Sequence, residues 1–170
     1  MEFLELAKNR YSVRKFKQSP VPEEAVLKIL EAARVAPTAC NFQPQKIITV
    51  RTAEGLEKFR RCTECHFDAP LGFIVCYDKT RCWNSKISEK SSGEIDATIA
   101  ATQMMLEAAD IGLGSTPVLY FIEEAVRHEF SLPDNIVPVL VIPMGYPADD
   151  AAPSKMHSTK RELSDTVIFE

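Results

Sequence analysis

The sequence predicts a single domain of the α+β or α/β class. Its 170 residues fit one domain, and no internal repeat or low-complexity tract divides them. Short apolar runs bounded by turn residues, at 47–50, 73–77 and 137–144, are typical of buried strands. Longer segments with helical spacing, above all 22–36 and 94–111, are typical of helices that pack on a sheet.

The first 37 residues are predicted to form two helices joined by an extended basic segment. Residues 2–9 make a short helix with one apolar side, and residues 10–17 alternate as an extended strand does. Pro22 suits a first helical turn, and the two glutamates after it favour a helix start. Apolar residues then repeat at helical spacing to about Ala36, and Pro37 ends the helix.

The middle of the chain is predicted to alternate between regular elements and loops. A polar loop at 38–44 leads into the strand 47–50, and a short helix follows at 53–61. After the strand 73–77, residues 78–93 are polar and are expected to form a loop or lid.

Residues 94–111 form the clearest predicted helix. Most of them are apolar or small, and the most polar ones lie on one narrow stripe: Asp96, Gln103, Glu107 and Asp110. A helix so apolar around its circumference should be buried, either in the core or against another subunit. Gly112 and Gly114 are expected to end it.

The last third of the chain is predicted to run through the sheet and leave it as a tail. A short strand or loop at 115–121 precedes a helix at 123–130. In the strand 137–144, Pro138 is an interruption, and Pro143 and Gly145 are expected to end it. Residues 147–162 are polar linker, and 166–169 are strand-like, able to pair with a sheet some distance away in a partner chain.

The composition excludes several classes of protein. A net charge of −4 gives no general attraction to nucleic acid or an anionic membrane, so a phosphate site would need a local cluster of cations. No run approaches the roughly 20 apolar residues of a membrane span, and residues 1–10 do not read as a signal peptide. We therefore expect a cytoplasmic protein whose five cysteines are reduced.

One cluster of cations lies in the segment 10–17, RYSVRKFK. In an extended strand Arg10, Ser12 and Arg14 share one face. Two guanidinium groups and a hydroxyl on one face would suit a phosphate. The alternative interpretation is a solvated basic edge that discourages aggregation.

The polar loop between Pro37 and Pro44 offers hydroxyl and amide groups. Thr38, Asn41 and Gln43 could read the edge of a heterocycle. An ordinary turn is the alternative, because asparagine and proline are common in turns for backbone reasons alone.

The sequence CTECH at 62–66 matches the attachment motif of c-type haem. With Cys82 it could instead supply zinc ligands, but a second closely spaced ligand pair is missing. We favour two structural or reactive thiols, Cys62 and Cys65, over a metal or haem site that also uses His66.

No motif supplies a catalytic base or nucleophile. The glycines at 112–115 follow a helix rather than a strand, so they do not form a dinucleotide-binding fingerprint. The three histidines are scattered singly, and neither a Walker motif nor a nucleophile elbow is present. An enzyme with this sequence would therefore need a cofactor for its chemistry.

Several of these segments, in this order, resemble the nitroreductase family of FMN-dependent oxidoreductases. They are RYSVRKF, ILEAARVAP, TACNFQP, ADIGLGS and IVPVLVIPMGYP. The resemblance covers nearly the whole chain and implies one domain over 1–170, of the α+β class, with a mixed central sheet flanked by helices. It also implies a homodimer with FMN at the interface, in which 147–170 form a linker and a tail that extends onto the partner subunit. The helix 94–111 and the tail 163–170 are the candidate dimer contacts.

The resemblance further implies which residues bind FMN. The segment with Arg10, Tyr11 and Ser12 holds the phosphate, together with a basic turn at Lys160 and Arg161. Arg14 lies near the flavin pyrimidine edge, where its charge would stabilise the reduced flavin. A loop reaches the flavin from the other subunit and contains Pro37, Thr38, Ala39 and Asn41. The backbone of Pro117, Val118 and Leu119 lies beside flavin N5.

The activity that the resemblance implies is electron transfer from NADH or NADPH to a small electron-poor acceptor, a nitroaromatic or a quinone, by a ping-pong mechanism. The flavin carries the hydride, no protein side chain is catalytic, and no metal is used. Gln45 stands where the family often has tryptophan, and Leu119 where it often has glycine. The chain is also short for the family, and its cysteine pair is foreign to the family pattern. These departures leave a non-catalytic flavin carrier or sensor as one alternative, and a metal or haem protein as another.

Overall fold

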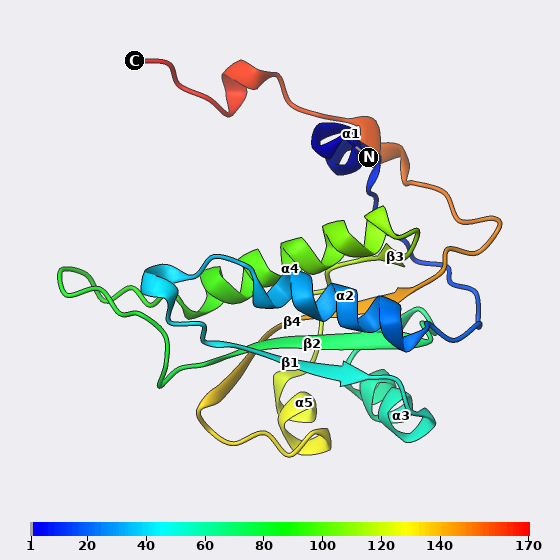
Figure 1. The fold of residues 1–170 in the computed structure, drawn as a ribbon, viewed down its shortest axis with the longest axis horizontal. Coiled ribbons are helices and arrows are strands. Elements are labelled where there is room, and N and C mark those ends of the chain that lie inside the picture. The colour runs from blue at the N-terminus through cyan, green and yellow to red at the C-terminus, as the bar shows by residue number, and fades with distance from the viewer. Residues whose placement is uncertain (1) are drawn as a thin grey trace.

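Four antiparallel strands form the central sheet of the computed structural model, which describes residues 2–170 (Figure 1). In sheet order they are β1 (Gln45–Val50), β2 (Leu71–Asp78), β4 (Ile136–Gly145) and β3 (Gly114–Ser115). Parallel pairing enters at the β3 edge, where a bridge joins Ser12 to Ser115. The α+β class is confirmed, and the ends of the predicted helices and core strands differ from the observed ones by at most two residues.

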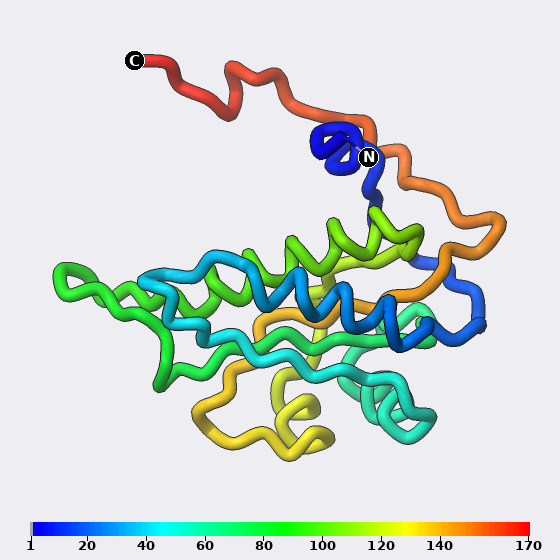
Figure 2. The backbone as a smooth tube through the Cα atoms, viewed as in Figure 1, coloured from blue at the N-terminus to red at the C-terminus, as the bar shows by residue number. Residues whose placement is uncertain are grey.

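Helices cover both faces of this sheet (Figures 1 and 2). On one face lie α2 (Glu23–Arg34) and α4 (Gly93–Asp110), and on the other lie α3 (Ala53–Cys62) and α5 (Glu123–Glu129). Successive residues of β2 serve the two layers in turn. Phe73 and Val75 join the core under α2 and α4, whereas Ile74 and Cys76 join the core under α3 and α5. A strand buried on both faces is apolar throughout, as the run at 73–77 is.

Pro138 interrupts the ladder of β4 as predicted, whereas Pro143 does not end the strand, contrary to prediction. Val75 pairs with Leu140 while Cys76 pairs with Pro138, so one residue of β4 is left over between them. Bulges are among the few places in a sheet where proline, which has no N–H to donate, is found. Pro143 pairs with Gly72, and β4 continues beyond it to Gly145.

The helix α4 is buried along one side only, with its inner face in the core. It ends in a left-handed turn in which Leu113 N–H donates to Ala108 O at 2.7 Å and Gly112 N–H donates to Ala109 O at 3.2 Å. Gly112 has φ +83°, which a side chain would oppose. Asp96, predicted to lie on the polar stripe, is instead buried with 1% of its surface exposed.

The helix α1 (Phe3–Asn9) and the tail 147–170 project from the body on the same side (Figures 1 and 2). The tail contains two short 3-10 turns, η3 (Lys155–Ser158) and η4 (Leu163–Asp165). Residues 166–169 form no strand in this single chain, so pairing with a partner stays a prediction. Within residues 2–170, no helix has the length and apolar character that crossing a membrane requires.

Candidate functional site

The basic segment 10–17 runs beside the β3 edge of the sheet. Val13 N–H donates to Ser115 O at 3.0 Å, and Ser12 forms the parallel bridge to Ser115. The approach is close because Gly114 has no side chain: a Cβ there would lie 2.5 Å from Val13 Cγ2. The segment is extended but forms no continuous strand: its pairing consists of isolated bridges at Ser12 and Phe16.

The tail divides the cations of this segment into two groups. Lys15 pairs with Asp150, and Lys17 Nζ lies 2.6 Å from Asp149 Oδ1, all at the surface. These two lysines fit the solvated-edge interpretation. The two arginines have no ion pair among residues 2–170, so their charges are left available to a ligand.

Arg10 carries the clearest sign of a missing anion. Its Nη1 is buried and has no hydrogen-bond partner among the described residues. A buried guanidinium nitrogen without an acceptor is costly, and a phosphate would supply the acceptor. Arg14 is exposed and its Nη1 donates only to Ser12 O, at 3.3 Å. The two arginines and Ser12 therefore fit an anionic ligand at the β3 edge.

A cavity of about 210 Å³ adjoins Arg10, between α1 and the end of α4. Tyr11, which also lines it, holds the tail: its hydroxyl donates to Ala151 O at 3.5 Å, and its ring meets His157 edge-on at 6.2 Å. The predicted phosphate ligands Lys160 and Arg161 follow shortly after in the tail, both exposed. Tyr11 thus orients the tail that carries them.

The turn at 37–41 is tightly bonded and strained. Asn41 N–H donates to Thr38 O at 3.0 Å, and Gln43 N–H donates to Thr38 Oγ1 at 3.1 Å. Cys40, Asn41 and Gln43 all have φ near +50°, a region that residues other than glycine rarely adopt. Strain of this kind often collects at functional sites, and the role of the turn in flavin binding stays a prediction.

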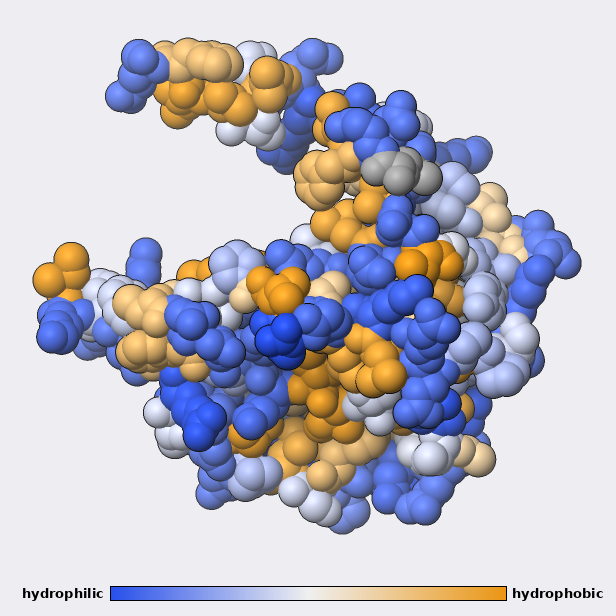
Figure 3. All heavy atoms as spheres, in the orientation of Figure 1, coloured by the Kyte–Doolittle hydropathy of each residue, from blue (hydrophilic) through white to orange (hydrophobic). Residues whose placement is uncertain are grey.

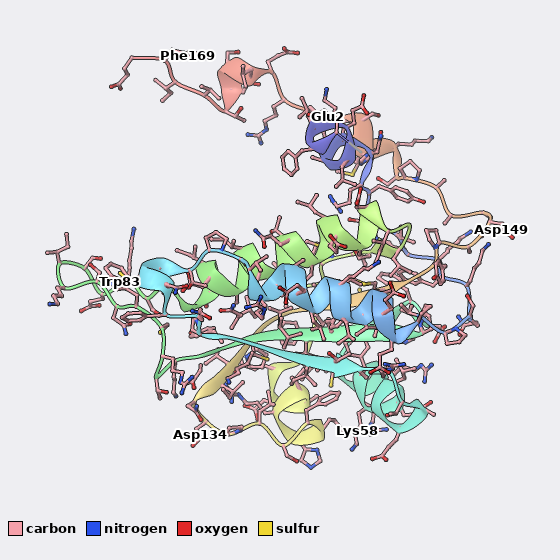
Figure 4. All side chains as sticks on the ribbon, viewed as in Figure 1. Glu2, Lys58, Trp83, Asp134, Asp149 and Phe169 are labelled. Atoms are coloured by element: carbon pink, nitrogen blue, oxygen red, sulfur yellow. The ribbon has the colours of Figure 1, made fainter. Side chains whose placement is uncertain are left out.

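The predicted flavin ligands form two groups, at opposite ends of α4. The turn adjoins the first turn of the helix, because Ala39 N–H donates to Asp96 Oδ1 at 3.0 Å. The cavity at Arg10 includes Ala109, which is 13 residues further along the helix, or about 20 Å. Figure 4 shows the same separation: Trp83, near the turn, and Asp149, near the basic segment, lie at opposite ends of the body. In one chain the two groups of predicted ligands therefore lie about 20 Å apart along α4.

The stretch predicted to lie beside flavin N5 belongs to the β3 group. Pro117 follows Ser115 by two residues, and Val118 exchanges two backbone hydrogen bonds with Val141, of 2.9 and 3.0 Å. Leu119 then points outward, with 76% of its surface exposed. Whether this backbone faces N5 stays a prediction.

An apolar groove of about 890 Å³ runs between α1, α2 and α4. Exposed apolar side chains line it, among them Phe3, Leu27 and Val35. The tail projects beyond it and carries five more exposed apolar residues: Met156, Leu163, Val167, Ile168 and Phe169. Figure 3 shows the hollow between tail and body, with apolar atoms along the tail. Exposed apolar surface of this extent marks an interaction site.

The CTECH segment anchors a neighbouring segment of backbone. Ile122 N–H donates to Cys62 O at 2.8 Å, and Thr63 Oγ1 donates to Tyr120 O at 2.5 Å. These bonds hold the chain just after Leu119. His66 Nδ1 accepts a hydrogen bond from Asp68 N–H at 3.0 Å, so this nitrogen faces the backbone of its own loop. Across residues 2–170, no three His, Cys, Asp or Glu side chains gather as metal ligands.

The Cys62 thiol is expected to be unreactive at neutral pH. Burial, the dominant cause, raises its pKa to about 11, so only about one thiol in a thousand is ionised at pH 8. Iodoacetamide should label the exposed Cys40 at pH 8 and label Cys62 only as the pH approaches 11, as followed by peptide mass spectrometry. Labelling of Cys62 at pH 8 as fast as Cys40, or bound zinc or iron by elemental analysis, would contradict this assignment.

Sequence reasoning missed the buried polar side chains that hold the loops of the site. Asp96 and Thr63 are 1% and 4% exposed and bond to backbone far away in sequence. Gln45, at the position of the family's tryptophan, donates to Ala33 O at 3.4 Å and has a buried Oε1 without a partner among the described residues. The sequence did contain one sign that Asp96 is buried and hydrogen-bonded: it lies in the first turn of an otherwise apolar helix, four residues after Ser92.

Comparison with known proteins agrees with this geometry. The family model described as Nitroreductase family matches residues 7–71 and 67–146. A Methanothermobacter thermautotrophicus protein named NADH dehydrogenase/NAD(P)H nitroreductase is 36% identical, over 94% of this chain and 88% of its own length.

Two solved structures from Clostridium difficile are similar in fold. A nitroreductase family protein of strain 630 is 40% identical and superposes with a TM-score of 0.93, covering 100% of this chain and 99% of its own. An FMN-dependent nitroreductase of strain R20291 is 25% identical, with a TM-score of 0.79 and 98% of each chain covered. The chain belongs to the nitroreductase family.

Proposed function

We propose that this chain is an NAD(P)H-dependent FMN oxidoreductase whose two flavin sites form between two copies of the chain. Its acceptor is a small electron-poor molecule, a nitroaromatic or a quinone, and turnover is ping-pong. Relatives named for NADH or NADPH oxidoreductase activity and an FMN-dependent structural neighbour support the cofactor and donor. The observation that carries the site is the buried Arg10 Nη1 without an acceptor.

The FMN phosphate is assigned to the β3 edge of one subunit. Arg10 and Ser12 bind it, and the tail brings Lys160 or Arg161 toward it through the contacts of Tyr11. Two cations and a hydroxyl match the charge and hydrogen-bonding needs of a phosphate. Lys15 and Lys17 are excluded from this role because aspartates of the tail already pair with them.

The isoalloxazine ring is assigned to contacts from both subunits. Arg14 places a fixed positive charge near the pyrimidine edge, which favours the anionic reduced form of a flavin. The turn 37–41 comes from the partner, because in its own chain it lies about 20 Å along α4 from Arg10. An antiparallel pair of subunits would place the two ends of neighbouring α4 helices together.

FMN held by Arg10, Ser12 and the partner's turn would supply the two-electron chemistry that links NAD(P)H oxidation to reduction of the acceptor. The chain contributes positioning and electrostatics, and no side chain at the site serves as an acid, base or nucleophile. The exposed Leu119 lies beside the predicted reactive edge, where it would limit the size of the acceptor. Donor and acceptor then use the same face in turn, which is the basis of ping-pong kinetics.

Steady-state kinetics of the FMN-loaded protein test this proposal. With NADPH or NADH as donor and menadione as acceptor, double-reciprocal plots at several fixed acceptor concentrations should give parallel lines. Intersecting lines would contradict the ping-pong scheme. An FMN-loaded protein that fails to oxidise either donor would instead be a flavin carrier or sensor.

A further inference from the structure

Asp96 is a buried carboxylate with no cation beside it. It lies in the first turn of α4 with 1% of its surface exposed, and no lysine or arginine among residues 2–170 forms an ion pair with it. A charge in this position is stable only if hydrogen bonds replace the lost water. The positive end of the helix dipole adds some compensation, and defined donors supply the rest.

Those donors come from two separate segments. Ala39 N–H, in the strained turn 37–41, donates to Asp96 Oδ1 at 3.0 Å. Ser92 Oγ donates to Asp96 Oδ2 at 2.7 Å. Each carboxylate oxygen thus has one partner, and both bonds are of the charge-assisted kind.

Ser92 extends the network to the segment 79–92. Its Oγ accepts from Trp83 N–H at 3.1 Å, and its own N–H donates to Trp83 O at 2.9 Å. Ser85 N–H donates to Lys90 O at 2.9 Å, so the segment closes as a hairpin-like loop. Figure 4 shows Trp83 at the end of the body where this loop projects. One carboxylate therefore joins the base of this loop to the turn.

We propose that Asp96 is a positioning residue that fixes the flavin-facing turn 37–41 and couples it to the loop 79–92. The turn needs such an anchor because two of its residues, Cys40 and Asn41, have positive φ, and a free turn would relax. This role rests on the proposed function, in which the turn contacts FMN bound to the partner. Asp96 itself does not touch the flavin.

Four variants test the coupling. Asp96→Ala removes both bonds, and Asp96→Asn keeps the shape and the acceptor for Ala39 but loses the charge. Ser92→Ala removes the bond to Asp96 Oδ2 and the bond from Trp83 N–H, but keeps the bond from Ala39 N–H. Glu94→Ala, in the same helical turn but exposed, is the matched control. Each protein is examined by FMN titration of the apoprotein, read by flavin fluorescence, and by hydrogen exchange of peptides covering 37–43 and 79–92.

Asp96→Ala should raise the FMN dissociation constant about tenfold or more and speed exchange in both peptides. Asp96→Asn should recover roughly half of the lost binding free energy, because neutral hydrogen bonds are about half as strong. Ser92→Ala should speed exchange in 79–92 while leaving FMN affinity within about threefold, and Glu94→Ala should change neither.

Wild-type FMN affinity in Asp96→Ala, with unchanged exchange in 37–43, would overturn the proposal. If Asp96→Ala does not fold, Asp96→Asn is measured in its place. Unchanged hydrogen exchange in 37–43 and unchanged FMN affinity in Asp96→Asn would also overturn the proposal. A wild-type protein that does not bind FMN would refute the proposed function, whereas the exchange measurements would still report whether Asp96 holds the turn.

Discussion

Replacing Arg10 with glutamate should abolish tight FMN binding. Hydrogen bonds to charged groups each contribute about 1.5–3 kcal/mol, and a bidentate guanidinium makes two. Their loss corresponds to about a 100-fold or larger rise in the dissociation constant, and repulsion between the new carboxylate and the phosphate adds to it. Fluorescence titration of the apoprotein with FMN measures this directly.

Lys58→Glu is the matched control for Arg10→Glu. It makes the same change of charge on α3, on the other face of the sheet, and loses only an exposed ion pair with Glu54. FMN affinity should be unchanged. Arg10→Ala provides a second test. The free energy of unfolding of the apoprotein should not fall, because this variant removes a buried nitrogen that lacks a hydrogen-bond partner. Tight FMN binding by Arg10→Glu would show that the phosphate is placed wrongly.

In the proposed dimer, deleting residues 163–170 should leave a monomer at micromolar concentration. The deletion removes Leu163, Ile168 and Phe169, which are 65%, 86% and 83% exposed in the single chain. Burying each such side chain stabilises an interface by about 1.5–3 kcal/mol, and a two-fold dimer would lose both tails. Sedimentation velocity reports the mass, and FMN affinity should fall with the dimer because each site needs both subunits.

Two further variants separate the tail from the groove. Replacing the same three tail residues by serine keeps the length of the tail and should have the same effect as the deletion. Leu27→Glu places a charge in the groove at an exposed helical position and should also give a folded monomer. Removal of Glu170 alone is the control and should leave the dimer intact. If the deletion variant sediments as a dimer and binds FMN with wild-type affinity, the tail does not contribute to the interface.

The elements of the fold are largely readable from the sequence because their patterns are local. Apolar residues at helical spacing placed α2, and the apolar run at 73–77 placed β2, each near its observed ends. The basic segment with Arg10 was also recognisable, since an extended chain with alternating cations is a local property. The interruption at Pro138 was predicted correctly, but Pro143 was wrongly predicted to end β4, because its pairing with Gly72 depends on the neighbouring strand.

Only the tertiary structure shows which of these charged residues are already paired with a distant residue and which are not. The tail brings Asp149 and Asp150 to Lys17 and Lys15 from more than 130 positions away, and so leaves the arginines for a ligand. Asp96 is buried because its partner Ala39 lies 57 residues earlier in the chain. Periodicity reports which face of an element is apolar, but it does not report which distant donor meets a given side chain. The sequence thus determined the elements and the likeness to the family, whereas long-range hydrogen bonds and ion pairs, which no local pattern reports, decided where the predicted site residues lie and which of them are paired.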